Sequence, residues 1–144
     1  MPVSSYLIEL NNKKILVDTG WHREISPNGN YDRIAQIKHM GLGHFLLNQG
    51  ILPIGESITE QLERIKIFPQ DLDFVILTHL HTDHASGLKQ VKNAKKIIVS
   101  EEELQDTKDF PIRYAKSMFD GINFETFKFK KTGIGPVGES FDLF

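Results

Sequence analysis

Four side chains that can bind a metal ion lie within six residues of the sequence. They are His79, His81, Asp83 and His84. Imidazole nitrogens together with a carboxylate oxygen suit zinc, and iron, manganese or cobalt are alternatives. The chain contains no cysteine, so no thiolate competes for the ion. The residue types and their spacing therefore predict a metal site.

The segment before these residues indicates a buried strand. Residues 74–77 (Phe-Val-Ile-Leu) are apolar on both faces, which is typical of a strand covered on both sides. Residues two apart in an extended chain point the same way, so His79 and His81 are expected to project together. Asp83 and His84 follow a turn, before a helix predicted over residues 85–91. They can reach the same centre or a second one beside it. The alternative is a solvated loop that carries three histidines by chance.

The segment His79-Leu-His-Thr-Asp-His84 resembles the HxHxDH signature of the metallo-β-lactamase superfamily. Ile15-Leu-Val-Asp-Thr-Gly20 resembles the DTG turn of that fold. Residues 68–73 and 96–101 are most similar to the branch that contains N-acyl-homoserine lactonases. The resemblance implies an αββα sandwich of the α+β or α/β class, with a mixed sheet and flanking helices.

The resemblance also implies how the residues share the work. His79 and His81 would hold one zinc, and Asp83 and His84 would help to hold a second. Asp83 is the candidate catalytic residue, because it can accept or relay a proton on ring opening. Asp18 is expected to support the site through hydrogen bonds without binding the metal.

Two other residues near the predicted site are weaker candidates, and two further histidines are not candidates. Trp21 and His22 directly follow the DTG turn and would lie at the mouth of the site, where either can contact substrate. A solvent-facing loop histidine is an equally good interpretation of His22. His39 and His44 fit no ligand spacing, so both are predicted to be structural or exposed.

The predicted chemistry is metal-assisted hydrolysis, in which the metal lowers the pKa of water and polarises the bond to be broken. The first hypothesis is a hydrolase of small-molecule esters or lactones. The second is a phosphodiesterase or nuclease, for which a basic face is missing: 17 Lys and Arg stand against 19 Asp and Glu, giving a net charge of -2. Binding of nucleic acid is therefore not expected. His81 stands where the iron oxidoreductases of the superfamily carry glutamate, which favours zinc and hydrolysis.

Length and composition indicate one domain over residues 1–144, with 40% hydrophobic and 25% charged residues. The resemblance implies further ligands in a second half, yet no histidine follows His84. Pro2-Val3-Ser4 also resembles the middle of a family sequence. We therefore expect a truncated, inactive half-domain that self-associates through an exposed sheet face. The alternative is a minimal protein that completes its site by dimerising.

The chain lacks the features of a membrane or secreted protein. No apolar segment approaches the roughly 18 residues that a membrane-spanning helix needs. No basic stretch followed by an apolar core stands at the N-terminus. We expect a cytoplasmic protein without a membrane partner.

The remaining elements follow from local signals. Asn11-Asn12 predicts a tight hairpin turn between two strands. Ser57 and Glu60 form a capping box that opens a helix to about residue 67, with Ile58, Leu62 and Ile65 as its buried stripe. A second capping box is predicted at Ser100 and Glu103.

Three further segments complete the prediction. Residues 31–40 are expected to form a short helix with Ile34, Ile37 and Met40 on one face. Residues 41–55 are interpreted as an apolar loop that packs on the core of the domain, lines a pocket or contacts a partner. Residues 111–119 are expected to form another helix.

Overall fold

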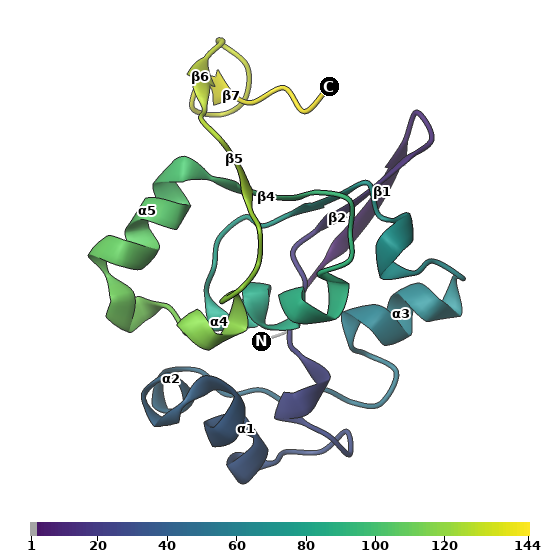
Figure 1. Ribbon diagram of the computed structural model, residues 1–144, viewed down its shortest axis with the longest axis vertical. Helices are drawn as coiled ribbons and strands as arrows, with labels where there is room; N and C mark the ends of the chain where they lie inside the picture. Colours follow the sequence, from purple (N-terminus) through teal and green to yellow (C-terminus); the bar gives the residue numbers. More distant parts are fainter. Residues whose placement is uncertain (1–2) are drawn as a thin grey trace.

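The computed structural model describes residues 3–144, and its main element is one mixed sheet (Figure 1). The segment interpreted above as mid-sequence lies partly outside the described residues, because it includes Pro2. The sheet has five strands in the order β1-β2-β3-β4-β5. β1 pairs antiparallel with β2, and the other three pairings are parallel. The strands of this sheet are β1 (Tyr6–Leu10), β2 (Lys13–Val17), β3 (Phe74–Ile76), β4 (Ile97–Ser100) and β5 (Glu125–Phe127).

The helices are short, and many are single 3₁₀ turns. The α-helices are α1 (Arg33–Met40), α2 (Leu42–Leu47), α3 (Ile58–Arg64), α4 (Thr82–Ala85) and α5 (Glu101–Asp109). The 3₁₀ helices are η1 (Arg23–Ile25), η2 (Pro69–Asp71), η3 (Ser86–Val91), η4 (Pro111–Arg113) and η5 (Lys116–Met118). A small separate hairpin, β6 (Lys130–Lys131) with β7 (Glu139–Ser140), precedes the C-terminus. α1 and α2 lie together at one end of the molecule, away from the sheet (Figure 1). The mixed sheet with flanking helices confirms the predicted fold class.

The turn between β1 and β2 forms as the sequence predicts. Asn11 and Asn12 have φ of 50° and 59°. Positive φ at both central residues gives a turn whose twist matches that of the flanking strands, and asparagine tolerates this conformation. The turn therefore fixes the register of the strand pair.

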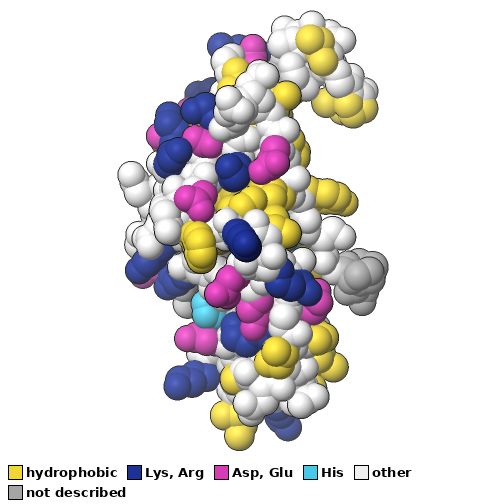
Figure 2. Space-filling model, turned by 90° about the vertical axis from the view of Figure 1, so that its right-hand side faces the viewer, with side chains coloured by type: hydrophobic (Ala, Val, Ile, Leu, Met, Phe, Trp, Pro, Cys, Tyr) yellow, Lys and Arg dark blue, Asp and Glu magenta, His cyan; other side chains and the backbone are white. Residues whose placement is uncertain are grey.

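The two faces of the sheet have different surroundings. On one face Leu16, Val75 and Val99 belong to a buried core that also contains residues of α3, η3 and η5. On the other face Tyr6 and Ile8 are 63% and 45% exposed. Hydrophobic side chains also gather between charged ones on the side of the molecule where β1 and α3 lie (Figure 2). The sheet is thus packed on one face and partly open on the other.

The C-terminal segment covers part of that second face. Phe141 stacks on Phe127 with ring centroids 4.3 Å apart, and Phe144 meets Phe74 edge-on at 6.1 Å. The registers of β3, β4 and β5 place Phe74 and Phe127 on the face opposite the core. These contacts leave β1 uncovered.

α3 ends earlier than predicted, and the reason is local. Its capping box forms, but the helix stops at Arg64 because Lys66 adopts φ of 59°. The amide of Ile67 then bonds the carbonyl of Leu62 (3.0 Å) and that of Lys66 bonds Glu63 (2.9 Å), which is a Schellman motif. The reversal turns Ile67 into the core and leaves Ile65 57% exposed, so the predicted stripe was wrong at Ile65.

Four other local predictions were wrong in part. Residues 41–55 contain α2, where Phe45 is buried while Leu46 is 69% exposed. Ile34 was predicted on the buried face of its helix but is 80% exposed, because the buried side of α1 carries Gln36 and Met40. Residues 111–119 form two 3₁₀ turns separated by extended backbone at Tyr114, whose φ and ψ are -121° and 122°. The helix that was predicted to begin at residue 85 already begins at Thr82 and continues as η3.

Within residues 3–144, no helix combines the length and the hydropathy that a membrane crossing requires.

Candidate metal centre

The predicted ligands lie where two neighbouring parallel strands end. β2 is followed by Asp18, and β3 is followed by Leu77, Thr78 and His79. The amide of Asp18 donates to the carbonyl of Ile76 (2.9 Å), which continues the pairing of the two strands to the edge of the sheet. Loops at the carboxyl ends of parallel strands meet at one edge, and sites in such folds lie there.

Asp18 connects these loops. Its Oδ1 accepts from the amide of Thr78 (2.8 Å), and its Oδ2 accepts from the Thr78 hydroxyl (2.7 Å). Oδ2 also lies 2.8 Å from Nδ1 of His84. The residue is 4% exposed and has φ of 58°, a conformation that aspartate tolerates better than most residues. Its carboxylate therefore orients both the strand end and the last histidine of the motif.

Three of the four predicted ligands converge. One ligand atom from each of His79, Asp83 and His84 lies within 4.8 Å of the others. The rings of His79 and His84 are 4.0 Å apart, and Nε2 of His84 is 3.7 Å from Oδ2 of Asp83. The ring of His81 lies beside this trio, 4.8 Å from His79 and 5.2 Å from Tyr114. The structure thus brings three ligands to one centre, whereas the four ligands were predicted from the sequence to divide into two pairs.

The donor set fits a divalent metal ion. Because Oδ2 of Asp18 accepts a hydrogen bond from Nδ1–H of His84, the ring proton stays on Nδ1 and Nε2 has a free lone pair. The Thr78 hydroxyl lies 3.0 Å from Nδ1 of His79. Burial lowers the pKa of His79, as do the neighbouring His84 and His81, against the opposing effect of Asp18 and Glu103. A lowered pKa keeps that imidazole neutral, as metal binding requires.

Glu103 supports the loop between His79 and His81. This contact was not predicted from the sequence. Its amide donates to Oγ of Ser100 (3.1 Å), so half of the predicted capping box forms. Its carboxylate instead accepts from the amide of Leu80 (2.7 Å). The local pattern explains Glu103 as a helix cap, and only the neighbouring position of β3 and β4 brings it to this loop.

The turn after β2 packs directly on the helix that carries the motif. The amide and hydroxyl of Thr19 both donate to the carbonyl of His84, at 2.9 and 2.8 Å. The amide of Gly87 donates to the carbonyl of Gly20 (2.8 Å). A Cβ atom on Gly87 would lie 2.5 Å from the carbonyl oxygen of Thr19, so only glycine permits this approach.

A groove of about 1310 Å³ reaches the metal ligands. Asp83 and His84 lie in its wall, together with Trp21 and the apolar residues Leu52 and Ile58. Trp21, predicted at the mouth of the site, is 7% exposed. His22 is absent from the lining, and its amide donates to Oγ of Ser86 instead (3.1 Å).

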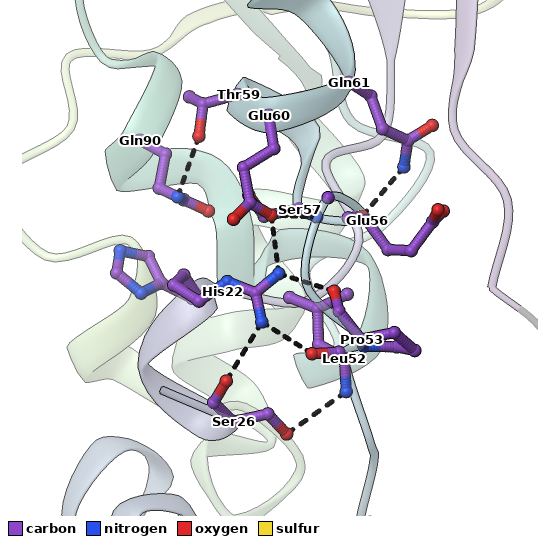
Figure 3. A network of polar contacts seen from close by, with 12 residues as sticks. His22, Ser26, Leu52, Pro53, Glu56, Ser57, Thr59, Glu60, Gln61 and Gln90 are labelled. Atoms are coloured by element: carbon purple, nitrogen blue, oxygen red, sulfur yellow. Dashed lines mark hydrogen bonds and ion pairs between the residues drawn. The ribbon is translucent and has the colours of Figure 1, made fainter. Parts of the chain in front are cut away.

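One arginine organises the far wall of this groove. Arg23 donates to the carbonyls of Ser26, Leu52 and Pro53 and to the carboxylate of Glu60, and these acceptors converge in Figure 3. Burial alone would raise the pKa of Glu60, but hydrogen bonds from Arg23 and Ser57 lower it to about 2. The network fixes the chain between α2 and α3.

Comparison with known proteins places this arrangement in a family. The family model described as the metallo-beta-lactamase superfamily matches residues 1–130. The chain belongs to the metallo-β-lactamase superfamily. An N-acyl homoserine lactonase AiiB from Rhizobium rhizogenes is 34% identical over 104 residues, which are 72% of this chain and 34% of that protein. An N-acyl homoserine lactonase from Bacillus cereus is 36% identical over 104 residues, 68% of this chain and 36% of that protein. The chain thus spans about a third of the length of these relatives.

Solved structures of superfamily members agree with this assignment. A quorum-quenching N-acyl homoserine lactone hydrolase aligns with a TM-score of 0.66 at 26% identity, covering 88% of this chain and 45% of that one. A variant of the Bacillus thuringiensis protein AiiA, with N-decanoyl-L-homoserine bound at its active site, aligns with a TM-score of 0.66 at 28% identity. That alignment covers 88% of this chain and 48% of that one. Over the aligned residues, this chain therefore has the same metallo-β-lactamase fold as the lactonase structures.

Proposed function

We propose that this chain supplies metal ligands to the active site of a zinc-dependent hydrolase that opens lactones or cleaves related esters. The observation that carries the proposal is the convergence of His79, Asp83 and His84 within 4.8 Å. Two further facts support it. The relatives named above are N-acyl homoserine lactonases. One structural neighbour, with a TM-score of 0.65 at 27% identity, has N-hexanoyl-L-homoserine bound at its catalytic metal centre.

The residues divide the work as follows. His79 and His81 would hold one zinc, and Asp83 and His84 would contribute to a second. When bound, zinc would supply a water of lowered pKa and polarise the carbonyl of the substrate. The side chain of Asp83 is 30% exposed at the groove, so it can accept or relay the proton when the ring opens. Asp18 keeps His84 in the tautomer that leaves Nε2 free.

The lining of the groove supports the proposed substrate class. Its wall combines polar ligands at Asp83 and His84 with apolar side chains at Trp21, Leu52 and Ile58. Small-molecule sites commonly pair a few polar groups with such a lining. We propose that the apolar wall takes the acyl part of the substrate, with Trp21 as a contact. His22 has no place in this lining and is not proposed as a substrate contact.

We further propose that the 144-residue chain turns over little or no lactone on its own. Zinc in proteins generally takes four ligands, with three from the protein in catalytic sites. Four protein ligands shared between two ions give each ion two, which is one fewer than a catalytic zinc takes from the protein. Detectable lactone hydrolysis by the purified chain that is lost in His81→Ala would contradict this proposal.

Self-association through the open sheet face is a related proposal. Tyr6, Ile8 and Leu10 are every second residue of β1, so their side chains lie on the same face of the sheet. They are 63%, 45% and 47% exposed. Apolar surface left in water costs about 25 cal/mol per Å², so a second copy that covers this edge strand is favoured. Sedimentation at high concentration should show a dimer or larger species that Ile8→Lys dissociates. Ile112→Lys, at a site 81% exposed elsewhere, is the control. A strictly monomeric wild-type chain would contradict the proposal.

The test of the chemical class uses cobalt as a spectroscopic substitute for zinc. N-decanoyl-L-homoserine and a phosphodiester are titrated separately into the cobalt-loaded chain and into His84→Ala. We expect N-decanoyl-L-homoserine to shift the visible spectrum of the wild type, and His84→Ala to lose the response. A response to the phosphodiester alone would favour a phosphodiesterase. No response to either compound would favour a non-catalytic half-domain.

A further inference from the structure

A second group of metal-binding side chains lies away from the strand ends. His22 caps the N-terminus of η1, Glu24 lies within η1, and His39 lies in the last turn of α1. One ligand atom from each lies within 4.8 Å of the others. Oε2 of Glu24 is 3.2 Å from Nδ1 of His39 and 3.9 Å from Nδ1 of His22. Ligands held at about 2.1 Å in a tetrahedron are about 3.4 Å apart, so this spacing is close to the one an ion would impose.

We propose that His22, Glu24 and His39 form a second metal site, distinct from the HxHxDH centre, that binds zinc or another divalent ion that favours imidazole. Two imidazoles and one carboxylate are a ligand set that zinc uses in proteins, with a fourth position left to water. The side chain of Glu24 is 71% exposed, so that fourth position faces solvent.

The two histidines are held as neutral rings. Their side chains are only 16% and 11% exposed, and the rings stack at 4.9 Å with 27° between their planes. Burial lowers the pKa of His22, and the neighbouring His39 lowers it further. Burial also lowers the pKa of His39, against the raising effect of Glu24, while Lys89 acts on both rings in the lowering direction. Neutral imidazoles near pH 7 are ready to bind a metal without first losing a proton.

Hydrogen bonds already orient both rings. Nε2 of His39 lies 3.1 Å from Oγ of Ser86, which leaves Nδ1 directed towards Glu24. A ligating histidine commonly has such a partner on its other nitrogen. Nδ1 of His22 accepts a hydrogen bond from the amide of Glu24 (3.0 Å), and a bound ion would replace that bond. A bound ion would also replace the contact between Nδ1 of His39 and Oε2 of Glu24 (3.2 Å), so each histidine exchanges one hydrogen bond for the metal.

The position of the site gives it a structural role. His39 is on α1, His22 and Glu24 are at η1, and Ser86 begins η3 directly after the HxHxDH motif. α1 and α2 form an arm at the end of the molecule (Figure 1). A metal at this point would fix the arm, residues 33–47, to η1 in the loop between β2 and α1. Binding to the folded chain alone stabilises it by mass action.

The decisive variant is Glu24→Gln, because an exposed carboxylate can be replaced by its amide without disturbing the fold. Glu63→Gln, an exposed position on α3, is the matched control. Zinc alone is added by equilibrium dialysis to the full chain and to His84→Ala, which weakens the strand-end centre. We expect Glu24→Gln to lower the affinity of one zinc at least tenfold in both backgrounds, and Glu63→Gln to leave it unchanged.

A second measurement follows the arm itself. Zinc should slow proteolytic cleavage within residues 33–47 in His84→Ala, and this protection should be absent when Glu24→Gln is added. The proposal is overturned if Glu24→Gln binds zinc as the wild type does. It is equally overturned if His84→Ala loses all bound zinc. Neither result depends on lactone hydrolysis, so failure of this proposal is distinguishable from failure of the proposed function.

Discussion

Asp18→Asn isolates the contribution of a residue that orients the metal ligands without being one. The carboxylate accepts from the amide and the hydroxyl of Thr78 and lies 2.8 Å from Nδ1 of His84. Asparagine keeps an oxygen for the Thr78 amide but places an N–H₂ group where Oδ2 stood. That group can donate to Nδ1 of His84, which shifts the ring proton to Nε2, the nitrogen needed by the metal.

The expected magnitude follows from these contacts. Hydrogen bonds to charged groups contribute about 1.5–3 kcal/mol each, and the substitution loses or reverses two of three. We expect the free energy of unfolding to fall by about 3–6 kcal/mol in metal-free urea denaturation. Loss of a partner that orients a ligand typically weakens metal affinity about 10–100-fold, which a competition titration with a chelating dye measures.

A matched substitution separates this effect from a general loss of a carboxylate. Asp32 caps α1 by accepting from the amide of Ala35 (2.9 Å), and asparagine is an equally good cap. Asp32→Asn should change the free energy of unfolding by less than about 0.5 kcal/mol and leave zinc affinity unchanged. The reasoning is refuted if Asp18→Asn binds zinc as tightly as the wild type does.

Three other substitutions test further parts of the structure. Glu103→Ala leaves the amide of Leu80 without its acceptor, so we expect a loss of about 1–3 kcal/mol in urea denaturation; no loss would show that water replaces the carboxylate. Gly87→Ala forces a Cβ against a backbone carbonyl and should cost about 1–3 kcal/mol, whereas Gly43→Ala meets nothing within 4 Å and should not lower the thermal midpoint. The pKa of Glu60 is lowered from 4.5 to about 2 in the folded chain, so its stabilising effect is complete above pH 4.5 and disappears as the pH falls towards 2. Glu60→Gln should flatten the pH dependence of stability across that window, and an unchanged slope would contradict the pKa.

The sequence predicted the parts of the fold that local chemistry decides. The turn at Asn11 and Asn12, the capping box of α3 and the strand before the motif all depend on neighbouring residues, and all formed. The strand is not covered on both faces as predicted, because Phe74 and Ile76 are only half-buried. The sequence placed His79, Asp83 and His84 in one short segment for the same reason, because strand, turn and helix follow one another in the chain. It paired His79 with His81, however, and the trio is seen only in the structure.

Other features depended on contacts between distant segments. Ile65 and Ile67 compete for the core at the end of α3, and the left-handed Lys66 decides the outcome. The carboxylate of Glu103 reaches Leu80 only because β3 and β4 are neighbours. His39 showed no ligand spacing in the sequence, since its partners lie 15 and 17 residues earlier. Such pairings need the tertiary structure.

The central claim is that the strand-end cluster of His79, Asp83 and His84 binds a metal ion. The most direct measurement is the zinc content, by elemental analysis after equilibrium dialysis, of Glu24→Gln and of Glu24→Gln combined with His79→Ala and His84→Ala. The shared Glu24→Gln background leaves the strand-end centre as the site that is counted. Zinc retained by the single variant and lost from the combined variant is the predicted result. Equal zinc content in both proteins, or none in either, would contradict the account.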